Sequence, residues 1–499
     1  METQDYPIWN IQSYGATGDR QSSDQEAIQK AIDACHEAGG GTVVCPAGDY
    51  LTGTLHLKDH ITLYLESGAT LWGSTDRPDY DVPHLIYAKN ARNFAILGPG
   101  TIDGQGEAFW VRDGARWRVG EFRPGKLLHF EECQNIRMHD FTVTNAPGWT
   151  IHTFRCDDVV ISGLTIINDP YGPNTDGIDP NCSTNMHISN CHIVAGDDCI
   201  VLKATESYPC ENITVTNCTL ETTCAALKLG TESYGNIRHC TFTNCTIRNT
   251  SAAITLYAKD GGVLENVLFS DITIEMASSL IYQSRDWPIF MDLERRNPDS
   301  ETGAIRDVTL SNLVIQTSGR CIVQGMASHP LERITLDNIT LKIAGFEDLS
   351  SVKKPRGGRT SWDDPEGGAH VAAPAHFVFS NIQGLKLRNI DLVVETQDGL
   401  QERSAVFADA VEDIRIDGFQ GRQSVPGGTS PALHLHNCGN AYITGSRASA
   451  DTGTFLHLDG PETAHVTLIG NDLTPAAQPV SAGDEVPDGV LFETANRMP

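Results

Sequence analysis

The feature that most constrains the fold is an internal repeat of constant period. Five segments align as short β-branched runs that carry a glycine, an asparagine or an aspartate at one shared position. These positions are spaced by 27 residues along the chain: Gly163, Asn190, Asn217, Asn244 and Asp271. A period between about 20 and 50 residues is typical of stacked repeat proteins, in which each unit packs on its neighbours.

Each repeat unit has the pattern of short strands joined by tight corners. Segments such as "DVVISGLTI", "NMHISNCHI" and "NITVTNCTL" alternate apolar and polar residues and lack helical periodicity. Related segments follow less regularly from Asp307, Arg333 and Leu385. The pattern predicts an all-β fold, a single-stranded right-handed parallel β-helix (solenoid) in which every coil pairs with the next.

The open end of such a stack exposes unpaired backbone, and the N-terminal region supplies a helix that could cover it. In "SSDQEAIQKAIDACHEAGGG", Ser23 and Glu26 form a predicted capping box, and the glycines at 39–41 end the predicted helix. Its apolar face consists of Ala27, Ile28, Ala31, Ile32 and Cys35. We therefore expect an N-terminal capping helix.

The repeat continues through most of the chain, which favours a single domain over residues 1–499. Two stretches break its rhythm, one rich in Gly, Pro and charged residues and the other rich in Pro. The expected parts are a cap region at about 1–60, coils at about 61–470, a surface-loop insertion at about 348–370 and a C-terminal tail at about 474–499.

Charge and composition exclude several classes of function. The chain has 36 Lys and Arg residues against 64 Asp and Glu residues, a formal net charge of −28. Such a surface repels nucleic acid and anionic lipid, so we expect no nucleic-acid partner and no membrane partner. The N-terminus lacks the pattern of a secretory signal, and no apolar run is long enough to span a bilayer. We expect a cytoplasmic protein, unless a signal was removed, with its 14 cysteines reduced and buried.

Two Gly-flanked turns bring three carboxylates into segments that otherwise resemble strands. "NTDGIDP" contains Asp176, and "AGDDC" contains Asp197 and Asp198. With the repeat interval as a ruler, the two turns lie about one coil apart, so the three carboxylates are expected within several ångströms on the outside of the scaffold. The same ruler places Asp176 in one column with Lys203, Gly230 and Tyr257, and Asp197 in one column with Cys224, Ser251 and Ser278.

Clustered carboxylates repel one another, which raises one pKa and leaves a protonated acid beside ionised partners. Cleavage of a glycosidic bond needs that division of labour. Two other interpretations remain open at this point. Single aspartates at corners are commonly solvated or satisfy backbone groups, and clustered oxygen ligands also suit Ca²⁺.

Three motifs in this order and spacing resemble the polygalacturonases of glycoside hydrolase family 28. They are "NAPGWTIH" at 145–152, "NDPYGPNTDGIDP" at 168–180 and "GDDCIVLKA" at 196–204. The resemblance extends from the N-terminal region to about position 280. It implies an inverting hydrolase without cofactor or metal, acting on an oligo- or polysaccharide. Asp197 would protonate the leaving oxygen, and Asp176 and Asp198 would activate water, with acid and base carboxyls roughly 6.5–9.5 Å apart.

Candidate substrate-binding residues come from the same motifs and from places where the chain departs from the family. Asn174 and His152 lie within the motifs, as does Trp149, whose more ordinary role is corner packing. Cys224 or Ala225 takes the position of the family's His. No Arg or Lys stands in register near residues 255–257, where the family's Arg-Ile-Lys motif belongs.

Residues near that register could supply other contacts. Lys259 shares a strand face with Tyr257 because their spacing is even, although an exposed corner lysine is the alternative. Lys228 lies on a neighbouring coil. In "SRDWPIFMDLERR", Trp287 could stack on a sugar and Arg285 could donate to it, although Trp287 could equally be buried.

The missing cations bear on the substrate, because a sugar carboxylate calls for a fixed cation such as arginine. We therefore expect an α-linked substrate of pectin type or a related oligosaccharide, but not standard polygalacturonan. The alternatives are a β-helical polysaccharide lyase, which needs a basic residue and usually Ca²⁺, and a non-catalytic carbohydrate-binding solenoid, which the absent His favours.

Overall fold

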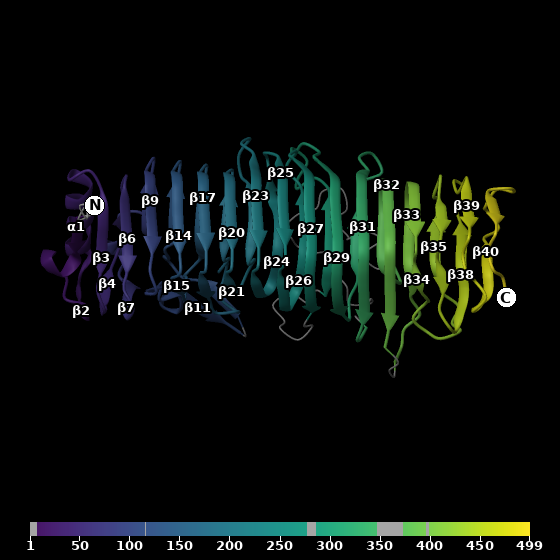
Figure 1. Ribbon diagram of the computed structural model, residues 1–499, viewed down its shortest axis with the longest axis horizontal. Helices are drawn as coiled ribbons and strands as arrows, with labels where there is room; N and C mark the ends of the chain where they lie inside the picture. Colours follow the sequence, from purple (N-terminus) through teal and green to yellow (C-terminus); the bar gives the residue numbers. More distant parts are fainter. Residues whose placement is uncertain (1–6, 115, 277–285, 347–372, 396–398) are drawn as a thin grey trace, which may run out of the picture. The chain divides into compact units, whose positions relative to one another are not determined.

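A computed structural model of the chain describes residues 7–114, 116–276, 286–346, 373–395 and 399–499. Its contacts divide it into two compact units, Met1–Leu227 and Lys228–Pro499, and each is described by itself. Parallel strands dominate both units (Figure 1). The described residues include no helix long and apolar enough to cross a membrane.

The first unit is built from three columns of parallel strands. In each column a strand pairs with the equivalent strand of the next rung. One column contains β6 (Ile61–Leu65), β9 (Arg92–Leu97), β14 (Gln134–His139), β17 (Asp157–Ser162), β20 (Thr184–Ser189) and β23 (Cys210–Thr216). A second contains β7 (Ala69–Gly73), β10 (Thr101–Asp103), β15 (Thr142–Thr144), β18 (Thr165–Ile167) and β21 (His192–Ala195). The third contains β8 (His84–Lys89), β13 (Lys126–Glu131), β16 (Trp149–Phe154), β19 (Ile178–Asn181) and β22 (Ile200–Ala204). This is the predicted parallel β-helix.

The repeat interval of the sequence is the pairing register of several rungs. Asp157 lies opposite Thr184, and Thr184 lies opposite Glu211 of the next rung. On the inner face the same register stacks Ile161, Ile188 and Val215, all fully buried. Burial of such a side chain contributes about 1.5–3 kcal/mol, so the repeat stabilises the fold by stacking identical apolar positions.

The register departs from the repeat interval at the corner that carries Asp176. In the third column Asn181, not Asp176, lies opposite Lys203, so the predicted column of Asp176 and Lys203 is wrong. The reason is corner length. The connection from β18 to β19 spans residues 168–177, whereas the equivalent connection in the next rung, from β21 to β22, spans only 196–199.

The shared polar position of the repeat forms a corner with left-handed backbone. Asn190 and Asn217 have φ angles of 56° and 57°, a conformation that Gly, Asn and Asp adopt most readily. Asn217 Nδ2 donates to Asn190 Oδ1 at 3.3 Å. In the second unit Asn312 donates in the same way to Asp271 Oδ1 at 3.0 Å. The corner residue therefore both turns the chain and bonds to the rung beside it.

The second unit has the same architecture of stacked parallel strands, several of them longer (Figure 1). Its repeats from Asp307, Arg333 and Leu385 pair in parallel, with Val308 opposite Ile334 and Ile334 opposite Leu385. They lie in β29 (Ala304–Thr317), β31 (Leu331–Ile343) and β32 (Ala375–Val394). The predicted surface loop at 348–370 lies outside the described residues.

The segment expected to be a tail is instead part of the stack. β40 (Ala476–Ala482) pairs in parallel with β38 (Thr452–Asp459), and β41 (Leu491–Thr494) pairs with β39 (Val466–Ile469). β40 contains Pro479, which an edge strand tolerates because one side of its backbone needs no ladder partner. The proline content of this segment therefore led to a wrong start for the predicted C-terminal tail.

The N-terminal helix α1 (Gln25–Glu37) begins without the predicted capping box. Asp24 occupies the N-cap and makes no side-chain capping bond. Its carboxylate instead accepts hydrogen bonds from Thr17 N at 2.6 Å and Gly18 N at 3.3 Å. Glu26 forms an ion pair with Lys30. The residues buried on the predicted apolar face are Ile28, Ala31, Ile32 and Cys35.

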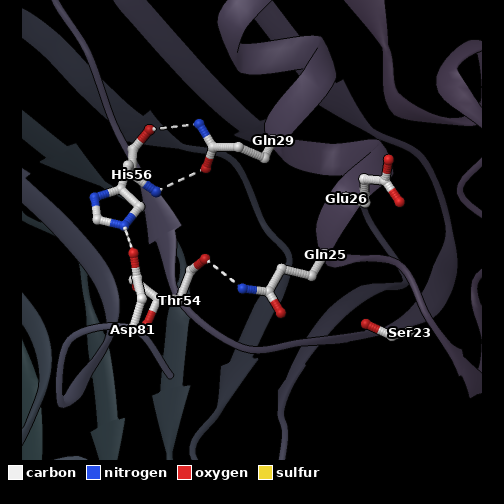
Figure 2. Close-up of a pocket in the computed structure, with 7 residues that line it drawn as sticks. All are labelled: Ser23, Gln25, Glu26, Gln29, Thr54, His56 and Asp81. Carbon is white, nitrogen blue, oxygen red and sulfur yellow. Dashed lines mark hydrogen bonds and ion pairs between the residues drawn. The ribbon is translucent and has the colours of Figure 1, made fainter. Parts of the chain in front are cut away.

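Hydrogen bonds attach α1 to the strand segment beside it, around the pocket drawn in Figure 2. Gln29 bonds the backbone of His56 twice, through Nε2 to the carbonyl at 3.2 Å and through Oε1 to the amide at 2.9 Å. Gln25 Nε2 donates to Thr54 O at 3.0 Å. His56 Nε2 in turn lies 2.8 Å from Asp81 Oδ2. These polar contacts fix the helix against the first rungs.

Candidate active site

The two Gly-flanked turns meet at one corner of the first unit. Gly177 N donates to Asp198 O at 2.9 Å, and Ile178 N donates to Cys199 O at 2.9 Å. Asn174 Nδ2 donates to Asp197 Oδ2 at 3.2 Å. Backbone pairing therefore places Asp176, which precedes Gly177, on the rung next to Asp197 and Asp198, as the sequence predicted.

Two of the three aspartates are buried, which corrects the expectation that all lie on the outside. Asp176 is 2% exposed and Asp198 1% exposed, whereas Asp197 is half-buried. An antiparallel hairpin, β11 (Trp110–Asp113) and β12 (Arg116–Val119), leaves the stack and attaches to this corner. Trp117 Nε1 donates to Asp169 Oδ2 at 3.1 Å. Among the three, Asp197 is the carboxylate most accessible to a ligand.

Asp179 and Lys203 complete a buried cluster that the sequence reasoning did not identify as a site. Lys203 Nζ lies 3.8 Å from Asp176 Oδ2 and 3.5 Å from Asp179 Oδ1. Asp179 is fully buried, and Lys203 is 4% exposed. The repeat interval does point to Asp179, because Asp179 stands one interval after His152 in the sequence and opposite it in the structure.

Burial and mutual repulsion raise the pKa of two carboxyl groups in this cluster. Burial raises the pKa of Asp176 well above its usual value, and the charges of Asp179 and Asp197 raise it further, while Lys203 opposes the shift. Burial likewise raises the pKa of Asp179, against the effect of Lys203. The site therefore contains two carboxyl groups with raised pKa values, those of Asp176 and Asp179, beside the half-exposed carboxyl of Asp197.

Arg123 supplies a cation to the same corner, and no motif pointed to it. Its Nη1 donates to Pro147 O at 3.0 Å and to Pro173 O at 2.5 Å, and its Nη2 donates to Asn174 Oδ1 at 3.2 Å. Asn174 thus bridges Arg123 and Asp197. Burial lowers the pKa of Arg123, while the charges of Asp176 and Asp197 raise it.

Trp149 lies between two lysines beside the acid cluster. Lys203 Nζ is 4.6 Å and Lys126 Nζ is 5.6 Å from its ring centroid. Lys126 lies opposite Trp149 on the neighbouring strand. Burial lowers the pKa of Lys126, and the Asp179 charge opposes this shift. Arg123, Lys126 and Lys203 form a group of cations, which we call the basic group, in a chain with a strong acidic excess.

His152 is a buried member of a histidine stack. It is 3% exposed, its Nδ1 lies 2.9 Å from His129 Nδ1, and its Nε2 lies 3.1 Å from Asn181 Nδ2. Burial lowers its pKa well below the usual value, and His129 contributes to the shift. His152 is therefore neutral, lies opposite Asp179 on the neighbouring strand, and has its ring 5.1 Å from that of Trp149.

Cys224, which with Ala225 is a candidate for the position of the family's His, lies beside the aspartate pair. Its Sγ and one carboxylate oxygen each of Asp197 and Asp198 lie within 4.8 Å of one another. The neighbouring Ala225 N donates to Asp198 Oδ1 at 3.3 Å. A thiol is a poor ligand for Ca²⁺, which prefers a shell made of oxygen ligands. The donor set of this trio therefore does not favour the Ca²⁺ interpretation.

The other predicted binding residues belong to the second unit, where most are buried. Tyr257 and Trp287 are 2% and 1% exposed and pack with Phe290 in an apolar cluster. Trp287 is thus in the core, so its ring is not available as a sugar platform. Lys228 Nζ lies 5.7 Å from the Tyr257 ring centroid. Arg285 lies outside the described residues.

Lys259 is neither an exposed corner residue nor a free cation. It is 1% exposed, and its Nζ bonds Asp292 Oδ2 at 3.0 Å and also Glu294 Oε1. Even spacing from Tyr257 indicated the correct face of the strand. That face is covered, however, so the cation is neutralised inside the second unit.

Comparisons with known proteins identify the family of the chain. The family model described as Glycosyl hydrolases family 28 matches residues 35–360. A probable polygalacturonase of Vitis vinifera is 30% identical over 266 residues, which cover 46% of this chain and 52% of the relative. The chain spans about half the length of the curated relatives it matches.

Two solved structures share the fold. An exopolygalacturonase of Thermotoga maritima has a TM-score of 0.62 at 22% identity, covering 78% of this chain and 92% of its own. A family 28 exopolygalacturonase of Yersinia enterocolitica has a TM-score of 0.65 at 20% identity, covering 83% and 79%. Both are right-handed parallel β-helices. Because the family model matches well over half of its 499 residues, the chain belongs to glycosyl hydrolases family 28.

Proposed function

We propose that the chain is a glycoside hydrolase that cleaves an α-linked bond in a pectin-type oligosaccharide, with inversion and without a metal ion. The observation that carries the proposal is the pairing of the two motif turns, in which Gly177 N bonds Asp198 O and Asn174 bonds Asp197. Family membership and the polygalacturonase names of its relatives support the reaction class.

In this proposal Asp197 is the general acid. Its half-exposed carboxyl is the one that a bound sugar reaches, and Asn174 holds one of its oxygens. Asp176 and Asp198 activate the water that attacks from the opposite side. Asp176 can act as a base only in its ionised form, which its raised pKa disfavours. The charges of Asp179 and Lys203 therefore set the pH above which Asp176 is ionised.

The substrate expected from the second unit is not standard polygalacturonan. No Arg or Lys stands at Thr255–Tyr257, and Lys259 forms ion pairs with two buried carboxylates. Because these residues offer no cation to a sugar carboxylate, we propose a pectin-type substrate whose recognised sugar carries no free carboxylate or carries a substituent.

A second candidate substrate, unbranched oligogalacturonate, is favoured by one specific observation. The basic group lies next to the acid cluster, and Lys126 makes no ion pair or side-chain hydrogen bond to another described residue. A cation of this kind could bind a sugar carboxylate from the first unit. Turnover of oligogalacturonates compared with methyl-esterified and xylose-substituted oligosaccharides separates the two candidates. If the basic group binds the sugar carboxylate, Arg123→Ala should lose more activity on oligogalacturonates than on the methyl-esterified or xylose-substituted oligosaccharides.

Loss of one carboxylate tests the reaction class. Asp197→Asn should reduce turnover by at least about 100-fold, the lower end of the range for removal of a general acid. The measurement is the release of reducing ends from the oligosaccharides named above, by the variant and by the parent chain. Unchanged turnover would reject the proposed acid. A product that absorbs in the ultraviolet would favour the lyase, and binding without turnover by the parent would favour the carbohydrate-binding solenoid.

A further inference from the structure

Two neighbouring strands of the second unit carry a group of metal-binding side chain types far along the sequence from the acid cluster. β35 (Pro431–His436) and β38 (Thr452–Asp459) pair in parallel, with His434 opposite His457 and His436 opposite Asp459. Leu433, Leu435, Leu456 and Leu458 alternate with them and are buried. His434, His457 and Asp459 therefore leave the same outer face of the sheet.

The donor atoms of these three residues converge. One ring nitrogen from each histidine and one oxygen of Asp459 lie within 4.8 Å of one another. His434 Nε2 is 3.8 Å from Asp459 Oδ2, and the two imidazole rings are 5.0 Å apart between centroids. Donors around a tetrahedral Zn²⁺ stand about 3.3 Å apart, given metal–ligand distances of about 2.0–2.1 Å. Small side-chain rotations bring the three atoms to that spacing.

The groups around the donors hold them in place for a cation. His457 Nδ1 bonds Ser481 Oγ at 2.8 Å, which leaves its Nε2 as the donor atom. Asp459 Oδ1 accepts from Gly460 N at 2.9 Å, which leaves Oδ2 on the side of the histidine. His434 Nε2 is buried and makes no hydrogen bond to any described residue. Ligating histidines characteristically have their other ring nitrogen held by a hydrogen bond, as the Nδ1 of His457 is held by Ser481.

We propose that His434, His457 and Asp459 bind a divalent transition-metal ion of the Zn²⁺ class, with solvent completing its coordination. Two imidazoles and one carboxylate suit Zn²⁺, Co²⁺ or Ni²⁺ better than Ca²⁺ or Mg²⁺, which prefer oxygen. The stacked strands fix the spacing, because His457 and Asp459 lie on the same face of one strand and His434 is the cross-strand neighbour of His457. The site is independent of the proposed hydrolysis.

Titration of the metal-free full-length chain with ZnCl₂, followed by calorimetry, tests the site. We expect one saturable Zn²⁺ per chain, and loss of that binding in His434→Ala and in His457→Ala. Ser481→Ala, which keeps all three donors, should weaken binding by about 10- to 100-fold. The matched control is His187→Ala, since His187 also bonds a hydroxyl, that of Thr214, but its cross-strand neighbours are Val160 and Thr214 instead of a histidine.

Two further readouts keep the test decisive. Co²⁺ bound in place of Zn²⁺ should show no thiolate charge-transfer band, because the 14 cysteines are buried. Oligosaccharide turnover should be the same in His457→Ala as in the parent, so failure of the metal site and failure of the hydrolase are seen separately. Absence of saturable binding, equal binding in the histidine variants, or a thiolate band would overturn the proposal. Ser481→Ala decides the question if a histidine variant fails to fold.

Discussion

Asp176 shares its buried corner with Asp179 and Lys203, and this balance of charge sets the pH at which it can act as a base. Its pKa is raised by burial and by the charges of Asp179 and Asp197, and lowered by Lys203. A base with a raised pKa loses activity as the pH falls through that value. The acidic limb of kcat/KM should therefore lie above the ordinary Asp value of about 3.9.

Two substitutions should move that limb in opposite directions. Asp179→Asn removes a negative neighbour, which lowers the pKa of Asp176 and shifts the limb to lower pH. Lys203→Met removes the compensating cation and shifts it to higher pH. The pH profile of kcat/KM measures both, with Lys89→Met, an exposed lysine paired to Glu131, as the control. Shifts in the same direction would contradict the assignment of Asp176 as the base.

Sequence reasoning found the residues of the motifs but not those that tune them. Asp176, Asp197 and Asp198 stood in recognisable turns, and the repeat interval brought the turns together. Arg123 carries no such signal, because it follows a hairpin outside the repeat and reaches the site by its side chain alone. Strand parity placed Lys259 on the correct face but gave no information on what covers that face.

The strands β26 (Thr246–Ala258) and β28 (Trp287–Leu293) are joined by the buried ion pairs of Lys259, which follows β26. Lys259→Met should lower the free energy of unfolding by about 3–5 kcal/mol, because it leaves Asp292 and Glu294 buried without their cation. Burial, then the Asp292 charge, raises the pKa of Glu294 to about 8 with the lysine present. Protonation of Glu294 removes its repulsion with Asp292. The loss of unfolding free energy in Lys259→Met should therefore be smaller at mildly acidic pH than at mildly alkaline pH.

Denaturant unfolding of the parent and Lys259→Met at both pH values makes this measurement. The matched control is Lys58→Met, which removes a half-exposed lysine paired to Asp33 and should cost at most about 1 kcal/mol. Equal stability of Lys259→Met and the parent would show that the cation is not needed.

The helix α1 is the element whose role as a cap we propose from its buried face. It packs against β1 (Ile8–Asn10), β3 (Gly41–Cys45) and β5 (Leu55–His56). Ile32→Ala should destabilise the chain by about 2–5 kcal/mol because it opens a cavity at a fully buried position. Gln29→Ala, which removes the two bonds to His56 and one bond to Asp33 but opens no apolar cavity, should cost less. Thermal unfolding that is unaffected by Ile32→Ala would exclude a stabilising role for the helix.

Element boundaries show which physical information the sequence carries. The repeat period predicted parallel stacking because equal strand spacing produces equal register. It did not predict the shift at Asn181 and Lys203, since corner length is independent of strand periodicity. It also missed β40, because proline is a signal against a strand only where both edges need partners.

Across the whole chain, the rungs extend further than the family match. The match ends at residue 360, whereas parallel strands continue to β41, which ends at Thr494. The acid cluster lies within the matched region and the proposed metal site lies beyond it. Substitutions in the last rungs therefore lie outside the matched region, which makes them useful controls for substitutions in the acid cluster.

The central claim is that Asp176, Asp197 and Asp198 together hydrolyse one glycosidic bond with inversion. Proton NMR of the earliest product tests it most directly, because the anomeric signal is read before mutarotation. An α-linked substrate should release the β-anomer first, and Asp197→Asn should release none. Early release of the α-anomer would contradict inversion, and product from Asp197→Asn at the parent rate would contradict the site itself.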